Sequence, residues 1–242
     1  MIYLLIGLVL MAGVLLLCAK SVTPEAIKEA APALSSLSVY PLRKEGDRLA
    51  LTVDGVDYFS WEGETDSLTG TPVWDWHGRM GDRLGMLLPD GGVFATGELF
   101  TLRDRKDILL AHLPEDGWPI TDMMLFLPEG TLLPEIRPDG FALAEVYRLK
   151  GEFQDECYER VCDITDPSRL CALAESWLSG GEYEPAEGEY ERYRIRLYSA
   201  EIPGLYAALN LHVNRATQAF VLERYRFRGD TLLPTELQNL FE

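Results

Sequence analysis

Histidine and cysteine are scarce in this chain of 242 residues, which contains three of the first and four of the second. The histidines, at positions 77, 112 and 212, stand far apart, and no cysteine lies beside one at a zinc-type spacing. We therefore predict no metal site.

Signatures of catalysis and cofactor binding are also missing. The glycine run at 89–92 reads as a hairpin turn and not as a phosphate loop, because no helix start follows it. No serine, cysteine or pair of acids stands in a recognisable catalytic context. We assign no catalytic residue, expect no cofactor, lean against an enzyme and recognise no family motif.

Basic residues are few relative to acidic ones: 22 lysines and arginines stand against 39 aspartates and glutamates, giving a formal net charge of −17. A field of that sign repels polyanions, so nucleic acid and anionic membrane surfaces are poor partners. Solvation and solubility explain the acidity.

What the chain does have is a long uncharged N-terminal stretch. Residues 2–19 carry no ionisable side chain except that of Cys18 and Tyr3. As a helix they would span ~27 Å, close to the ~30 Å hydrocarbon core of a bilayer. The stretch is longer than the usual apolar core of a signal peptide, which favours an uncleaved transmembrane anchor.

Two alternatives to a retained anchor stay open. The stretch could be a cleaved signal peptide, or a lipoprotein signal that ends with lipidation at Cys18. Lipoprotein processing requires a small residue just before the cysteine, and Leu17 fits that requirement poorly. We expect the bilayer to be a partner through residues 2–19.

Two opposing patterns indicate on which side of the membrane the body lies. Lys20, Lys28, Arg43 and Lys44 follow the stretch, and the positive-inside rule would keep them in the cytoplasm. A single N-terminal apolar segment before one soluble body is, however, the common layout of an exported protein. We expect an extracytoplasmic body, with a cytosol-facing regulator as the alternative.

Three cysteines belong to the body, at positions 157, 162 and 171. Export would allow one disulfide among them. Three separate thiols are an equal alternative.

The rest of the chain divides into a stalk or linker at 20–36 and a β-rich globular body at 37–242. Asp54-Gly55 between two apolar runs predicts a hairpin, and 62–85 reads as a long polar loop. Asp166 and Pro167 predict the start of a helix at about 166–179, which Gly180-Gly181 ends. We predict an α+β fold, mainly antiparallel sheet with one covering helix, preceded by an N-terminal hydrophobic helix.

Short echoes suggest that the body consists of two related halves. The sequence Thr-Leu-Leu-Pro occurs at 131–134 and again at 231–234, each time after an apolar run. We predict the halves at 37–135 and 140–242.

A repeated pattern of arginines supplies the first candidate site. Alternate residues of a strand point to opposite faces, so arginines two apart share one face. Asn210 and His212 on the strand between the two copies are expected on that same face. A small anionic ligand or a protein could neutralise the charges, as could the nearby glutamates 182, 184, 187 and 189. The candidate ligand-binding residues are Arg192, Arg194, Arg196, Arg224, Arg226, Arg228, Asn210 and His212.

The second candidate is a loop that combines aromatic and ionisable groups, at Trp74, Trp76 and His77. Buried tryptophans that anchor a loop explain it more simply than a binding site does. The sequence thus favours a membrane-tethered, extracytoplasmic binding or interaction module of unknown specificity. The alternative is an enzyme with a dispersed site near Trp76 and His77.

Overall fold

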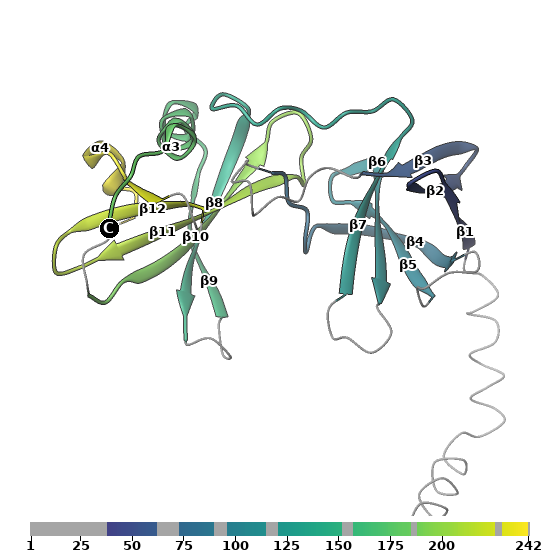
Figure 1. The fold of residues 1–242 in the computed structure, drawn as a ribbon, viewed down its shortest axis with the longest axis horizontal. Coiled ribbons are helices and arrows are strands. Elements are labelled where there is room, and N and C mark those ends of the chain that lie inside the picture. Colours follow the sequence, from purple (N-terminus) through teal and green to yellow (C-terminus); the bar gives the residue numbers. More distant parts are fainter. Residues whose placement is uncertain are drawn as a thin grey trace, which may run out of the picture.

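Two β-sheets follow one another along the chain in the computed structural model (Figure 1). The structure describes residues 38–61, 73–89, 96–114, 121–151, 157–184, 188–225 and 229–241. The predicted α+β class, rich in antiparallel sheet, is confirmed, whereas the closure of the first sheet into a barrel was not predicted. The predicted anchor at 2–19, its Cys18 and the stalk at 20–36 lie outside the described residues.

The first sheet is a closed barrel in the order β1-β2-β3-β7-β6-β5-β4. Its neighbours pair antiparallel except β1 and β4, which close the barrel as a parallel pair. The strands are β1 (Ser38–Glu45), β2 (Arg48–Val53), β3 (Val56–Ser60), β4 (Met80–Pro89), β5 (Gly97–Leu102), β6 (Arg105–Pro114) and β7 (Thr121–Pro128).

The hairpin predicted at Asp54-Gly55 is confirmed. It joins β2 to β3, and both turn residues have positive φ, 49° at Asp54 and 80° at Gly55. A two-residue turn of this kind needs positive φ at both central positions, which aspartate tolerates and glycine adopts freely.

The polar loop predicted over 62–85 was wrong in its last part, because β4 begins at Met80. Two glycines and two charges hide the strand pattern. Gly85 has a structural reason: it lies where β1 crosses close, and a Cβ there would clash with the backbone carbonyl of Ser38. The parallel pairing that closes the barrel therefore depends on the absence of a side chain at residue 85.

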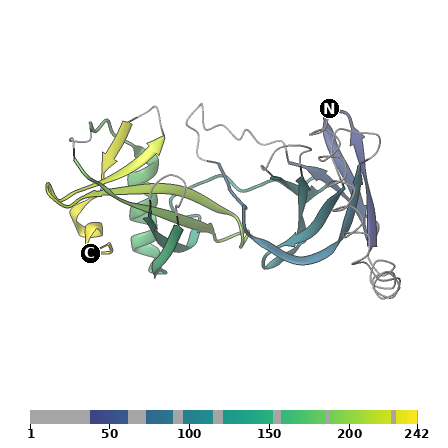
Figure 2. The same cartoon turned by 90° about the horizontal axis from the view of Figure 1, so that it is seen from below.

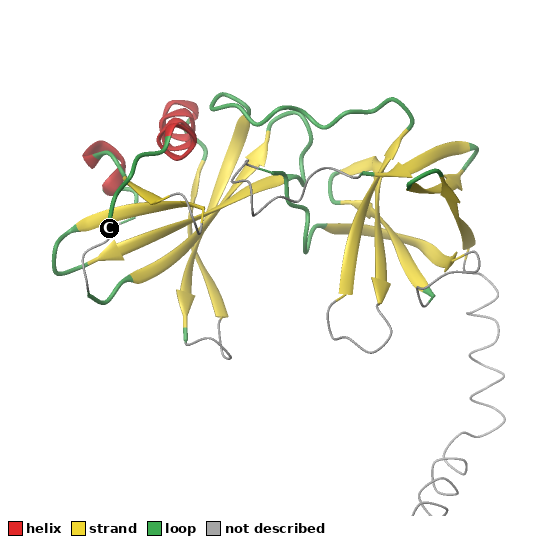
Figure 3. Ribbon diagram, viewed as in Figure 1, coloured by secondary structure: helices red, strands yellow, loops and turns green. Residues whose placement is uncertain are grey.

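The second sheet is open, with six antiparallel strands in the order β13-β12-β11-β10-β8-β9 (Figure 3). The strands are β8 (Phe141–Lys150), β9 (Cys157–Ile164), β10 (Glu191–Ser199), β11 (Tyr206–Asn214), β12 (Ala219–Tyr225) and β13 (Gly229–Leu232).

Helix α3 (Pro167–Ser179) covers one face of this sheet, where it contacts β8 and β12 (Figures 1 and 2). The predicted helix start is confirmed, since the side chain of Asp166 accepts a hydrogen bond of 3.0 Å from the backbone N–H of Arg169. Leu170, Leu173 and Trp177 are buried in the interface with the sheet. The opposite face of the sheet is therefore not covered by α3.

A short helix, α4 (Thr235–Gln238), lies near the C-terminus; Thr235 and Gln238 have the spacing of a capping box, but the box does not form. Pro234 occupies the N-cap position, which has no side-chain cap. Gln238 instead donates a hydrogen bond of 2.9 Å from Nε2 to the carbonyl of Leu233.

Two hydrophobic cores meet at β6 and β7. Leu109, Ala111 and Phe126 belong to the cluster inside the barrel. Their neighbours Leu110 and Leu125 belong to the larger cluster that includes α3 and the apolar face of the second sheet. Strands buried on both faces read as continuous apolar runs, as these two do.

Within the described residues, no helix is long and apolar enough to span a bilayer.

Cys162 and Cys171 are free thiols, and burial raises the pKa of each. The first sheet ends at Pro128 and the second begins at Phe141, near the predicted division. Relatedness between the halves stays a prediction.

Replacing Gly85 by alanine should destabilise the protein, because the added Cβ meets backbone and cannot be relieved by a side-chain rotation. We expect a loss of about 1–3 kcal/mol in the free energy of unfolding, measured by denaturant titration of the full chain in a mild detergent. Gly181→Ala is the control, since its Cβ would meet only the rotatable side chain of Thr231 at 3.2 Å. Equal losses in the two variants would contradict the closure argument.

Candidate functional site

The face of the second sheet opposite α3 carries most of the predicted site. Arg192, Arg194 and Arg196 of β10 alternate with Tyr193 and Ile195, which are buried in the core beneath α3. Across the strand pair, Arg192 lies opposite His212 and Arg194 opposite Asn210. The predicted common face is therefore confirmed for Arg192, Arg194, Arg196, Asn210 and His212, although ligand binding there stays a prediction.

The predicted face of the second copy of the arginine pattern stays a prediction. Glu223 is the β12 residue that pairs with Asn210, and the pairing of β12 with β13 shifts register between Glu223 and Tyr225. The side chain of Arg224, and Arg226 and Arg228 entirely, lie outside the described residues.

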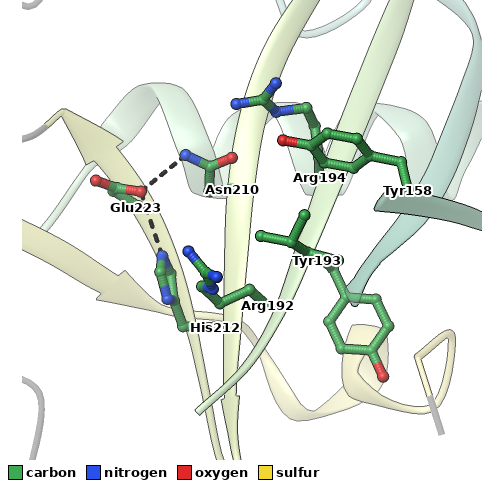
Figure 4. A pocket seen from close by; sticks show the side chains of 8 residues that line it. Tyr158, Arg192, Tyr193, Arg194, Asn210, His212 and Glu223 are labelled. Carbon is green, nitrogen blue, oxygen red and sulfur yellow. Dashed lines mark hydrogen bonds and ion pairs between the residues drawn. The ribbon is translucent and has the colours of Figure 1, made fainter. Parts of the chain in front are cut away.

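A pocket of about 130 Å³ opens on this face of the sheet (Figure 4). Side chains from β8, β9, β10, β11 and β12 line it, so five neighbouring strands contribute to one site. The lining residues are Leu149, Tyr158, Arg192, Tyr193, Arg194, Asn210, His212 and Glu223.

Glu223 is held in place by two hydrogen bonds. Its Oε2 accepts from Asn210 Nδ2 at 2.8 Å and lies 3.2 Å from His212 Nε2 (Figure 4). Opposite Glu223 on β13, burial and the charge of Glu223 raise the pKa of Asp230. The β12 side of the pocket is therefore acidic, which the sequence pattern did not indicate.

Arg194 and Arg196 rest on aromatic rings. The guanidinium carbon of Arg194 lies 5.1 Å from the ring centre of Tyr158. That of Arg196 lies 5.1 Å from the ring of Tyr147 and 4.9 Å from the ring of Tyr206. Such stacking stabilises a cation but satisfies none of its N–H groups. In the described part of the chain, the buried Nε of each of these two arginines has no hydrogen-bond acceptor.

At its other end the same polar face meets the segment that leads into β4, through an ion pair between Arg79 and Glu145. Arg79 Nη2 lies 2.5 Å from Glu145 Oε2, and the two side chains are only 11% and 9% exposed. The hydroxyls of Tyr147 and Tyr198 each donate to the same Oε2 at 2.7 Å. Arg79 also lies over the ring of Tyr198, 4.4 Å from its centre.

The predicted aromatic loop has a structural role at this contact. Trp74 and Trp76 are buried, and their indole N–H groups donate to the carbonyls of Pro134 at 2.7 Å and Met123 at 3.0 Å. These hydrogen bonds fix the segment between the barrel and the second sheet. The simpler explanation offered from the sequence, tryptophans that anchor a loop, agrees with this geometry.

His77 is the exposed member of that segment, with 58% of its side chain accessible. Its Nδ1 lies 2.6 Å from Asp75 Oδ1, and its backbone N–H donates to the same oxygen at 2.8 Å. Burial would raise the pKa of Asp75, but these hydrogen bonds outweigh burial and lower that pKa. A carboxylate-oriented imidazole suits proton transfer, yet His77 is not among the residues that line the pocket.

Tyr206 ties β11 to the same segment. Its backbone pairs with Asp75 in an isolated bridge, and its hydroxyl donates to the carbonyl of His77 at 3.1 Å. Burial, with the nearby charge of Asp75, raises the pKa of the phenol well above its ordinary value. Tyr206 therefore stays neutral and can donate.

Comparison with protein-family models, curated proteins and solved structures finds no match. Function is therefore inferred from the residues of the site.

Replacing Arg79 by methionine should destabilise the protein strongly, because it leaves the buried carboxylate of Glu145 without its closest cation. We expect a loss of about 3 kcal/mol in the free energy of unfolding, measured by denaturant titration. Arg83→Met is the matched control: its ion pair with Glu98 is exposed, and its loss should cost less than about 1 kcal/mol. A loss as small as that of the control would show that the pair does not hold the two sheets together.

Proposed function

We propose that the chain is a membrane-tethered, extracytoplasmic binding module that captures small anionic ligands on the polar face of its second sheet. Residues 2–19 would anchor it in the bilayer as a hydrophobic helix, and the pocket beside Arg194 would hold the ligand. Arg192 and Arg194 would supply the positive charge that attracts an anion.

The observation that carries this proposal is the state of Arg194. Its guanidinium carbon lies over the ring of Tyr158, 5.1 Å from the ring centre, and its buried Nε has no acceptor among the described residues. A buried polar group without a partner is unfavourable, so a ligand that supplies an acceptor gains the energy of satisfying it. Guanidinium offers paired donors that match the oxygens of a carboxylate or a phosphate.

The location of the pocket supports the same proposal. A protein with a net charge of −17 repels anions from most of its surface. Two arginines concentrated beside one pocket provide a local exception. Stacking on the Tyr158 ring also keeps the cation of Arg194 in a defined orientation before a ligand arrives.

Arg194→Gln should weaken anion binding about tenfold or more, because one charge-assisted hydrogen bond contributes about 1.5–3 kcal/mol. Butyrate and inorganic phosphate are the probes, titrated calorimetrically into the full chain in a mild detergent. Arg169→Gln, an exposed arginine of α3, is the matched control and should bind like the unaltered chain. The proposal fails if neither probe binds, or if Arg194→Gln binds both as well as the control does.

The tether makes a separate prediction about location. A reporter enzyme that is active only outside the cytoplasm, fused after Glu242, should be active in a bacterial host and should lose activity when residues 2–19 are deleted. Membrane fractionation should recover the undeleted fusion with the bilayer. An inactive reporter on a membrane-bound fusion would place the body in the cytosol and would contradict the proposed topology.

A further inference from the structure

The pocket on the second sheet has ends of opposite charge. Arg194, Asn210 and Glu223 are successive partners on β10, β11 and β12, so they form one row across three neighbouring strands. With ~4.8 Å between strands, the Cα atoms at the two ends of this row lie about 10 Å apart. Both end residues line the same pocket (Figure 4).

The acidic end is fixed by its neighbours. Asn210 and His212 both engage Oε2 of Glu223, so its carboxylate stays on the pocket wall. Asp230 pairs with Glu223 from β13, next to this end but not among the residues that line the pocket. A ligand that carries only negative charge would be attracted at Arg194 and repelled as it extends toward Glu223.

The basic end is equally well defined. The guanidinium carbon of Arg194 lies over the ring of Tyr158, while Arg192, which also lines the pocket, lies beside His212 (Figure 4). Asn210 lies between the two ends and carries no charge. The row thus presents a cation, a neutral amide and a carboxylate in that order. A ligand with a negative group at one end and a positive group at the other would complement it.

The size of the pocket sets the scale of the ligand. Its volume of about 130 Å³ is close to that of an engineered protein cavity of roughly 150 Å³ that binds benzene. A few carbon atoms between two charged groups fill such a space.

We propose that the ligand is a small amino-carboxylate, with its carboxylate on Arg194 and its ammonium group facing Glu223. This inference rests on the proposed anion-binding function and narrows it to zwitterions. Phosphate, which lacks the ammonium group, would bind only at the arginine end.

The test compares three molecules of similar size: 4-aminobutyrate, butyrate and butylamine. Each is titrated calorimetrically into the full chain in a mild detergent. We expect 4-aminobutyrate to bind about tenfold more tightly than either singly charged molecule. Glycine and 6-aminohexanoate extend the series to shorter and longer charge separations, and affinity should pass through a maximum along it.

Two variants assign the two ends of the ligand. Glu223→Gln should reduce the preference for 4-aminobutyrate over butyrate to about twofold or less, while butyrate still binds. Arg194→Gln should weaken binding of both. The comparison on the unaltered chain does not depend on either variant being stable.

The outcomes distinguish zwitterion binding from the proposed anion binding. Equal affinity for butyrate and 4-aminobutyrate in the unaltered chain would overturn the zwitterion inference and leave anion binding intact. A preference that survives in Glu223→Gln would also overturn it. Failure of every carboxylate to bind while phosphate binds would overturn the zwitterion inference alone, and failure of phosphate as well would overturn both.

Discussion

The burial of β6 and β7 on both faces is the constraint on which the rest of the structure depends. One face of each strand lines the barrel, and the other belongs to the larger hydrophobic cluster, which also contains Trp74, Trp76 and the apolar face of the second sheet. Neither sheet can therefore shift without exposing apolar surface of these strands. This fixes where the segment that carries Arg79 meets the second sheet, and so which part of the polar face stays open.

The polar face has a closed end and an open end, and arginines occupy both. At the closed end, Arg79 forms an ion pair with the carboxylate of Glu145. Toward the open end, the guanidinium groups of Arg196 and Arg194 lie over the rings of Tyr147 and Tyr158. A ring stabilises the charge of an arginine without occupying its in-plane donors, whereas a carboxylate occupies them. Arg79 also lies over the ring of Tyr198, so what distinguishes it from Arg194 is the carboxylate of Glu145, since Arg194 has no ion pair among the described residues.

The features predicted correctly from the sequence depend on residues close together in the chain. Asp54 and Gly55 predict a hairpin because both residues tolerate the positive φ that its turn requires. Asp166 predicts a helix start because its side chain can accept a hydrogen bond from a backbone N–H three residues later. The common face of Arg192 and Arg194 follows from the period of a strand. All three need only local geometry.

What the sequence did not predict depends on contacts between distant residues. Gly85 reads as a loop residue until β1 is placed against it, and Arg79 and Glu145 are 66 positions apart. The acidic end of the pocket was missed because the pairing of β11 with β12 sets Glu223, and not an arginine, opposite Asn210. That register depends on contacts between two strands and not on the pattern within one strand. The open sheet has one more consequence, because unlike the barrel it ends in two outer strands, β9 and β13. An unpaired strand edge invites another chain to add to it and so begin a polymer. β13 has only four residues, and β9 displays Glu159, Arg160 and Asp163 to solvent, charges that an added strand would have to desolvate. The shape and charge of these two edges thus favour solubility over fibre growth.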